Sequence, residues 1–224
     1  MKKVLTIIMS LVIMAMFTAC SGNEANDDSK SASTEANKVE EQSASKKSNS
    51  KILVAYFSRA GVNYQVGVVE KGNTRIVAEM IADATGADMF EIKTVKSYPE
   101  TYQECTEIAK QEAEANARPE LANKLENIAQ YDTIFLGYPI WWSDFPMAVY
   151  TFLESYDFNG KKIIPFCTSA DDNKMTGKEV NIPNIAKGSS LLEGIGLQGK
   201  RCQDDPQSIR QDVDNWLSSM NLPK

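Results

Sequence analysis

The residues best suited to bind an anion lie between a short apolar run and an amphipathic helical pattern. Residues 52–57 are apolar, β-branched and aromatic, which predicts a buried strand, and residues 76–84 show apolar spacing typical of a helix. The first N–H groups of a helix lack internal partners, and its dipole favours negative charge. Ser58, Asn73 and Thr74 would add side-chain hydrogen bonds, so this loop predicts a phosphate site. The alternative is a helix capped by Asn73 or Thr74 that binds nothing.

A pair of adjacent tryptophans forms a second candidate binding element. Trp141 and Trp142 follow an apolar run at residues 133–138, which predicts another buried strand. Two neighbouring indoles offer a large flat surface on which a planar ligand could stack. The alternative is that one tryptophan packs in the core and the other covers the next helix. A phosphate at one end and a flat ring at the other describe a mononucleotide, and FMN is the mononucleotide that brings redox chemistry.

The chain contains no histidine, which limits the kinds of catalysis and metal binding that its side chains can perform. This absence excludes Ser-His-Asp and Cys-His catalysis, histidine metal ligands and histidine as a general base. The four cysteines show no metal-binding spacing. Cys105, Cys167 and Cys202 could form one disulfide in an exported protein or be buried as small hydrophobic residues. We therefore expect a cofactor to supply any chemistry, with no catalytic side chain and no metal.

Alternating strand and helix patterns must position these loops. Strands are expected at residues 52–57, 88–92, 133–138, 162–167 and 190–195, with helices at 73–84, 101–116, 146–153 and 206–220 and a short helical stretch at 121–128. Most strands are continuous apolar runs, which indicates a doubly wound parallel α/β sheet covered on both faces. Pro165 predicts a local irregularity in the fourth strand, and Cys202 is expected in a loop. Ligands of such sheets bind at the carboxyl ends of the strands.

The N-terminal residues predict export. Residues 1–20 combine two lysines, an apolar stretch too short for a membrane span, and small residues before Cys20, as in a bacterial lipoprotein signal peptide. A plain secretory signal and an uncleaved anchor are the alternatives. Residues 21–50 form a polar linker that would span roughly 30 Å, and residues 51–224 suffice for one domain. We expect a lipid on Cys20 and a location on a membrane of the bacterial cell envelope.

The charge and the glycine patterns exclude several ligand classes. The chain has a net charge of −6 and no basic patch, which argues against nucleic acid. No Gly-Lys-Ser/Thr follows the glycines near residue 72, so the loop is not a Walker A motif. It also lacks the glycine spacing of dinucleotide-binding folds.

At these loops the sequence resembles the flavodoxin family, and more closely its lipoprotein-anchored branch with an extended first loop. The resemblance covers residues 52–216, and its most specific pieces are Tyr56-Phe57-Ser58-Arg59 with Gly72-Asn73-Thr74, and Gly137-Tyr138-Pro139-Ile140-Trp141-Trp142. Residues 165–169 support it. It implies a five-stranded parallel sheet in the order 2-1-3-4-5, with FMN at the point where the strand order reverses.

The resemblance also implies a set of cofactor-binding residues. The phosphate would lie against Ser58, Arg59, Asn73, Thr74 and the backbone of Arg75, the isoalloxazine ring against Pro139, Ile140, Trp141 and Trp142, and the N3/O2 edge of the ring against the backbone of Thr168, Ser169 and Ala170. Two departures stand out: residues 62–71 split the phosphate loop, and Ala170-Asp171-Asp172 replaces the glycine-rich turn of many relatives.

Three functions fit this sequence. The first is a lipid-tethered FMN protein that exchanges electrons with a redox partner protein or a small-molecule donor or acceptor. The second is an FMN-dependent NAD(P)H or quinone reductase. The third is an interaction module that binds no flavin.

Overall fold

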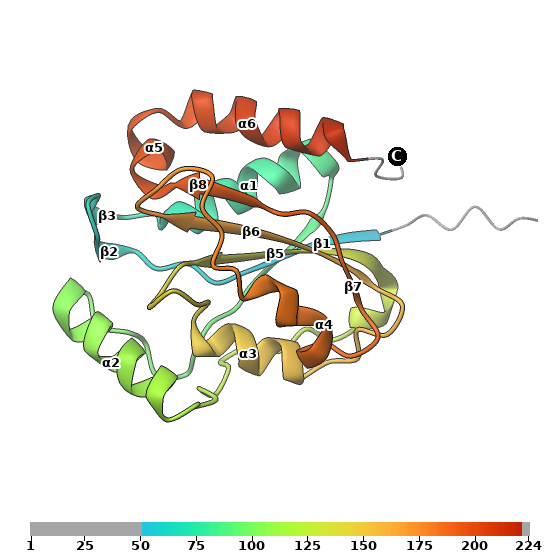
Figure 1. Ribbon diagram of the computed structural model, residues 1–224, viewed down its shortest axis with the longest axis horizontal. Helices are drawn as coiled ribbons and strands as arrows, with labels where there is room; N and C mark the ends of the chain where they lie inside the picture. The colour runs from blue at the N-terminus through green and yellow to red at the C-terminus, as the bar shows by residue number, and fades with distance from the viewer. Residues whose placement is uncertain (1–50, 221–224) are drawn as a thin grey trace, which may run out of the picture. The chain divides into compact units, whose positions relative to one another are not determined.

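A parallel sheet forms the centre of residues 51–220, the part of the chain that the computed structural model describes (Figure 1). The expected signal peptide, lipidated Cys20 and linker lie outside the described residues. Five strands follow the order β4-β1-β5-β6-β7, and β8 also pairs with β6. Their bounds are β1 Lys51–Tyr56, β4 Asp88–Glu91, β5 Tyr131–Pro139, β6 Lys162–Ser169, β7 Ser190–Leu191 and β8 Ile195–Gln198. All of these pairings are parallel.

The last strand is interrupted opposite Pro165. β7 pairs with Lys162 and Ile163 of β6, whereas β8 pairs with Phe166 to Ser169, so the two pieces occupy one position in the sheet. Proline has no N–H to donate to a neighbouring strand. The pairing of β6 with β5 continues through Pro165 without a register shift. The predicted strand order 2-1-3-4-5 is therefore confirmed, and the irregularity predicted at Pro165 lies on the edge-strand side.

Helices cover both faces of the sheet (Figure 1). The helices are α1 Asn73–Thr85, α2 Tyr102–Glu114, α3 Met147–Glu154, α4 Ile182–Ile185, α5 Gly199–Asp204 and α6 Pro206–Ser219, with 3-10 turns at Ile128–Gln130 and Glu179–Asn181. Apolar residues of α1, α5 and α6 belong to one core cluster, and those of α3 and α4 belong to the other. The doubly wound α/β class predicted from the sequence is confirmed. Within residues 51–220, no helix has the length and apolar character that crossing a membrane requires.

Several local predictions were wrong. Gly72, rather than Asn73 or Thr74, is the N-cap of α1, and it makes no side-chain capping bond. Leu121 forms an isolated antiparallel bridge with Thr94, so the predicted helical stretch at 121–128 is absent except for the 3-10 turn that starts at its last residue. Cys202 lies in α5 and not in a loop. These segments are short, and tertiary contacts outweigh weak local preferences there.

Two further features settle open points. Residues 61–69, most of which belong to the insertion at 62–71, form a small antiparallel hairpin, with β2 Gly61–Asn63 and β3 Gly67–Val69. Cys105, Cys167 and Cys202 are all buried free thiols. Burial raises the pKa of Cys167 and of Cys202 to about 12, which keeps both in the thiol form at neutral pH. Of the two readings of these cysteines, the structure supports burial as small hydrophobic residues.

Candidate functional site

A cavity of about 320 Å³ lies at the carboxyl ends of β1, β5 and β6. All of the predicted cofactor-binding residues except Arg75 line it: Ser58, Arg59, Asn73, Thr74, Pro139, Ile140, Trp141, Trp142, Thr168, Ser169 and Ala170. The three loops that the sequence analysis singled out therefore meet around one space. Its volume is at the lower end of the range typical of ligand pockets.

The N-terminus of α1 forms one end of the cavity. The N–H of Arg75 donates to Ser58 Oγ at 3.0 Å. No hydrogen bond among the described residues uses the N–H of Asn73 or of Thr74, so both remain available to an anion. The hydroxyls of Thr74 and Thr168 are 2.8 Å apart and buried, which joins the first loop to the end of β6.

The side chain of Arg75 turns away from the cavity. Its Nε lies 3.0 Å from Glu79 Oε1, one turn further along α1, and its Nη1 lies 3.9 Å from Glu91 Oε2. Only the backbone of Arg75 was expected to contribute to the site, and that N–H is occupied by Ser58. Arg75 therefore orients the serine hydroxyl.

Arg59 lines the cavity, but its guanidinium binds the chain itself. Nη1 donates to Val62 O at 2.7 Å, and Nε and Nη2 donate to Pro99 O at 3.1 and 2.6 Å. Nη2 also lies 2.5 Å from Glu100 O and 3.3 Å from Thr101 O. These carbonyls belong to the hairpin and to the segment that leads into α2. Arg59 thus holds two walls of the cavity together and has little capacity left for a phosphate.

We expect Arg59→Lys to weaken ligand binding at this cavity and to lower the free energy of unfolding by about 1–2 kcal/mol. A lysine ammonium is compact and cannot reproduce the fork of bonds to several carbonyls. Chemical denaturation and a ligand titration would measure the two effects. Arg118→Lys is the control, because Arg118 pairs with Glu154 beyond the other end of α2 and should affect stability alone. Unchanged stability and binding in Arg59→Lys would contradict this role.

The two tryptophans have different surroundings. The ring of Trp141 packs edge-on against Phe57 and Tyr98, with centroids 5.2 and 5.0 Å apart. Trp142 is 55% exposed, and its Nε1 donates to Thr106 O of α2 at 3.1 Å. Trp141 therefore joins the core and still borders the cavity, whereas Trp142 offers a large accessible ring at its edge.

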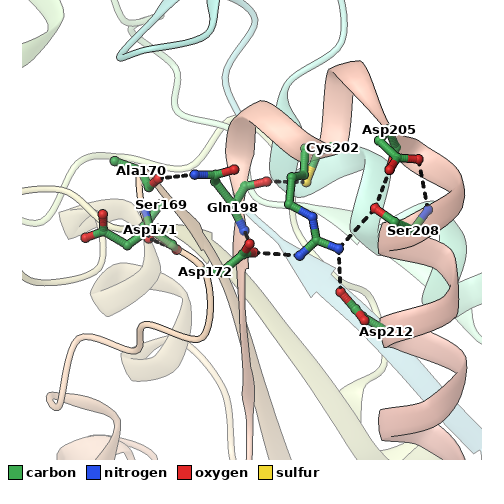
Figure 2. A network of polar contacts seen from close by, with 10 residues as sticks. Ser169, Ala170, Asp171, Asp172, Gln198, Cys202, Asp205, Ser208 and Asp212 are labelled. Atoms are coloured by element: carbon green, nitrogen blue, oxygen red, sulfur yellow. Dashed lines mark hydrogen bonds and ion pairs between the residues drawn. The ribbon is translucent and has the colours of Figure 1, made fainter.

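The turn after β6 is held by hydrogen bonds within the turn and by contacts of Asp172, a residue that does not line the cavity. The N–H of Asp171 donates to Ser169 Oγ at 3.1 Å, and that hydroxyl lies 2.8 Å from Asp171 O, which closes a tight turn. Asp172 Oδ1 accepts from the backbone of Gln198 and from Arg201, both at 2.9 Å (Figure 2). Side-chain hydrogen bonds thus hold this turn, for which the family resemblance implies a glycine-rich sequence in many relatives.

A buried carboxylate supports the chain beyond this turn. Glu179 is 6% exposed, and its Oε1 accepts from Tyr138 Oη at 2.8 Å, Thr176 N at 2.9 Å and Thr176 Oγ1 at 2.7 Å. Burial alone would raise the pKa of Glu179, but the bonds from Thr176 and Tyr138 outweigh it and lower that pKa. The carboxylate therefore stays ionised and holds the segment that contributes Asp171 and Lys174 to the cavity.

The hairpin and α2 form a further wall of the cavity that was not predicted from the sequence. The additional lining residues are Asn63, Tyr64, Val66, Tyr102, Cys105, Thr106 and Ala109, together with Asp171 and Lys174. Tyr64 stacks on Tyr102 with centroids 5.7 Å apart, and burial raises the pKa of Cys105. The spacing of Tyr102, Cys105 and Ala109 on one helical face was the available signal. Nothing in that spacing indicated whether the face would meet the sheet or a cavity.

Comparison with known proteins identifies a family model and solved structures that are similar to this chain. A family model described as flavodoxin matches residues 51–218. The fold is similar to that of a proposed flavoprotein from Bacteroides uniformis ATCC 8492, with 30% identity over 75% of this chain and 98% of that one and a TM-score of 0.58. A proposed flavoprotein from Bacteroides eggerthii DSM 20697 gives 28% identity over 78% of this chain and 100% of that one, with a TM-score of 0.59. No curated protein matches the sequence.

Proposed function

Because the chain belongs to the flavodoxin family, we propose that its cavity binds FMN and that the protein transfers electrons through it. The observation that carries this proposal is the convergence of free helix N–H groups, buried hydroxyls and an exposed indole on one cavity. Bound FMN would supply one- and two-electron redox chemistry. The residues of this chain would bind it, orient it and limit its contact with water.

The donors at the start of α1 fit a phosphate monoester. Neutral groups would donate the hydrogen bonds to the phosphate: the N–H groups of Asn73 and Thr74 and the hydroxyl of Ser58. The dipole of α1 adds a favourable potential for negative charge at this end of the helix. Arg59 and Arg75 use their guanidinium groups elsewhere. A dianion held in this way depends on hydrogen-bond geometry more than on a formal positive charge.

The opposite end of the cavity fits an aromatic ring. Ile140 and the indoles of Trp141 and Trp142 contribute apolar surface, and Tyr64 and Tyr102 line the same cavity from the hairpin and α2. Stacking on such rings suits a planar heterocycle. The Ser169–Asp171 turn offers backbone groups for the polar edge of that heterocycle.

The direct test is a titration of the full, purified chain with FMN, monitored by quenching of flavin fluorescence. We expect a dissociation constant in the micromolar range or tighter. Thr74→Val should weaken FMN binding more than riboflavin binding, because its hydroxyl lies at the start of α1 and bonds to Thr168 Oγ1. Thr85→Val is the matched control, since Thr85 bonds to Ile81 O at the far end of the same helix. Failure to bind FMN in the micromolar range would overturn the proposal.

The proposal extends to a lipid anchor on Cys20, an exported protein and electron exchange at a membrane of the bacterial cell envelope. It is supported by the sequence of residues 1–50 alone. A redox partner protein or a small-molecule donor or acceptor would be the physiological partner. Fractionation of cells that express the full chain should find it in membranes, and Cys20→Ser should release it. A Cys20→Ser protein that stays in the membrane fraction would argue for an uncleaved anchor.

A second candidate function is an FMN-dependent NAD(P)H or quinone reductase. The exposed rings of Trp142, Tyr64 and Tyr102 at the cavity edge favour it, because they offer a surface for a second planar molecule. Steady-state oxidation of NAD(P)H with a quinone acceptor distinguishes a reductase from a carrier. Identical thermal unfolding with and without FMN would favour the third possibility, an interaction module without flavin, since a ligand of the native state must stabilise it.

A further inference from the structure

We propose that α5 and the residue before it form a bracket that positions both ends of the cavity, with Gln198 and Arg201 at the ring end and Gln203 at the phosphate end. The inference rests on the proposed function, because it assigns these three residues to FMN binding. None of them lines the cavity. They are positioning residues, which would act through the loops that touch the ligand.

The contacts at the ring end fix the turn after β6. Gln198 Nε2 donates to Ala170 O, and the backbone N–H of Gln198 donates to Asp172 Oδ1, both at 2.9 Å. Arg201 Nη1 lies 2.9 Å from the same carboxylate oxygen. Figure 2 shows the side chain of Gln198 pointing toward Ala170, with Asp172 next to the backbone of Gln198. Gln198 thus holds Ala170, which is expected at the polar edge of the ring, and both Gln198 and Arg201 hold Asp172, two positions further along the chain.

Arg201 is itself anchored to the next helix. Its Nη2 donates to Ser208 Oγ at 3.0 Å and to Asp212 Oδ2 at 2.8 Å, both on α6. Cys202 is 1% exposed, so α5 is also fixed by packing in the core. The guanidinium therefore links a cavity loop to α6, whose residues Ile209 and Val213 are buried in the core.

The contacts at the phosphate end come from Gln203, two residues after Arg201 in the same short helix. Gln203 Nε2 donates to Asn73 Oδ1 at 2.7 Å and to Lys71 O at 2.8 Å. These two residues flank Gly72, immediately before and at the start of α1. At the first position of α5, a Cβ on Gly199 would lie 2.5 Å from Asn73 Nδ2, so the helix and the phosphate loop are in close contact.

Two probes separate the two arms of the bracket. In the full chain, Gln203→Ala should weaken FMN binding about fivefold and leave riboflavin, which lacks the phosphate, within twofold of the wild-type value. Arg201→Ala should weaken FMN and riboflavin by the same factor, about fivefold. A residue that only stabilised the fold would not produce this difference between probes.

Arg210→Ala is the matched control. Arg210 also forms two ion pairs, with Asp83 and Asp214, but it does not contact the cavity loops. It should leave both affinities unchanged. Asp212→Asn separates anchoring from long-range electrostatics, because it removes a negative charge yet loosens Arg201. Weaker binding in Asp212→Asn supports anchoring, whereas tighter binding would overturn it.

Each arm of the bracket has an outcome that would overturn it. Arg201→Ala with both affinities within twofold of the wild type would overturn the ring-end arm, and a Gln203→Ala chain with unchanged FMN binding would overturn the phosphate-end arm. A wild-type chain that binds no FMN refutes the proposed function separately. Amide hydrogen exchange of the ligand-free chain then tests the anchor. The N–H of Gln198 should exchange faster in Arg201→Ala than in Arg210→Ala, and equal rates would overturn the bracket.

Discussion

Gly72→Ala is expected to weaken FMN binding about 100-fold, because it would displace the start of α1 and with it one or two hydrogen bonds to the charged phosphate, each worth about 1.5–3 kcal/mol. Gly72 has φ −66° and ψ 149°, a backbone conformation that any residue adopts. Glycine is required there for space alone. An added Cβ would meet the side chain of Ser58 and lie 2.5 Å from Arg59 O, and a backbone oxygen cannot rotate away as a side chain can. The start of α1 would therefore have to move away from Ser58 and Arg59, which follow β1.

The measurement is an FMN titration of the full chain, combined with chemical denaturation. Overpacking at Gly72 should lower the free energy of unfolding by about 1–3 kcal/mol. Gly86→Ala is the control at the other end of the same helix. Gly86 has φ +68° with no atom near its Cβ position, so the variant should lose about 1–2 kcal/mol of stability through backbone strain and bind FMN normally. Equal FMN affinity in the two variants would contradict this account.

The sheet could be predicted from the sequence because its strands are self-contained signals. Residues 133–138 are apolar at almost every position, and such a run is stable only when both faces of the strand are buried. The structure extends this strand to Tyr131–Pro139 and places it at the centre of the sheet. The positions of the three binding loops then follow, since all of them leave the carboxyl ends of parallel strands.

The far wall of the cavity could not be predicted in the same way. α2 shows an ordinary amphipathic pattern, and its place over the cavity depends on Arg59, whose bonds to Val62 and Pro99 connect segments about 40 residues apart in sequence. No local pattern encodes such contacts. The same holds for Gln203 and Asn73, which are bonded to each other although they lie 130 positions apart in the sequence.

Glu179→Ala is expected to lower the free energy of unfolding by about 3 kcal/mol, the largest loss we predict from a single polar side chain. The carboxylate oxygen accepts three hydrogen bonds in a buried site. Alanine would leave the hydroxyl of Tyr138 and two donors of Thr176 without an acceptor. Tyr138 is fully buried, so water cannot easily replace the carboxylate. FMN binding should weaken as well, because the same segment carries Asp171 and Lys174.

Chemical denaturation of the ligand-free chain would measure the loss, with Glu193→Ala as the control because Glu193 is exposed. Tyr138→Phe removes one of the orphaned donors, so it should lower the free energy of unfolding less in the Glu179→Ala background than in the wild type.

The direction of the pKa shift of Glu179 allows a second test, in which stability is measured as a function of pH. Since folding lowers the pKa of Glu179, its ionised form contributes stability above the unfolded pKa of about 4.5 and loses it as the pH falls through the folded value. Glu179→Gln should therefore flatten the decline of stability in that acidic range, and an unchanged slope would show that the buried carboxylate is not what couples this segment to the sheet.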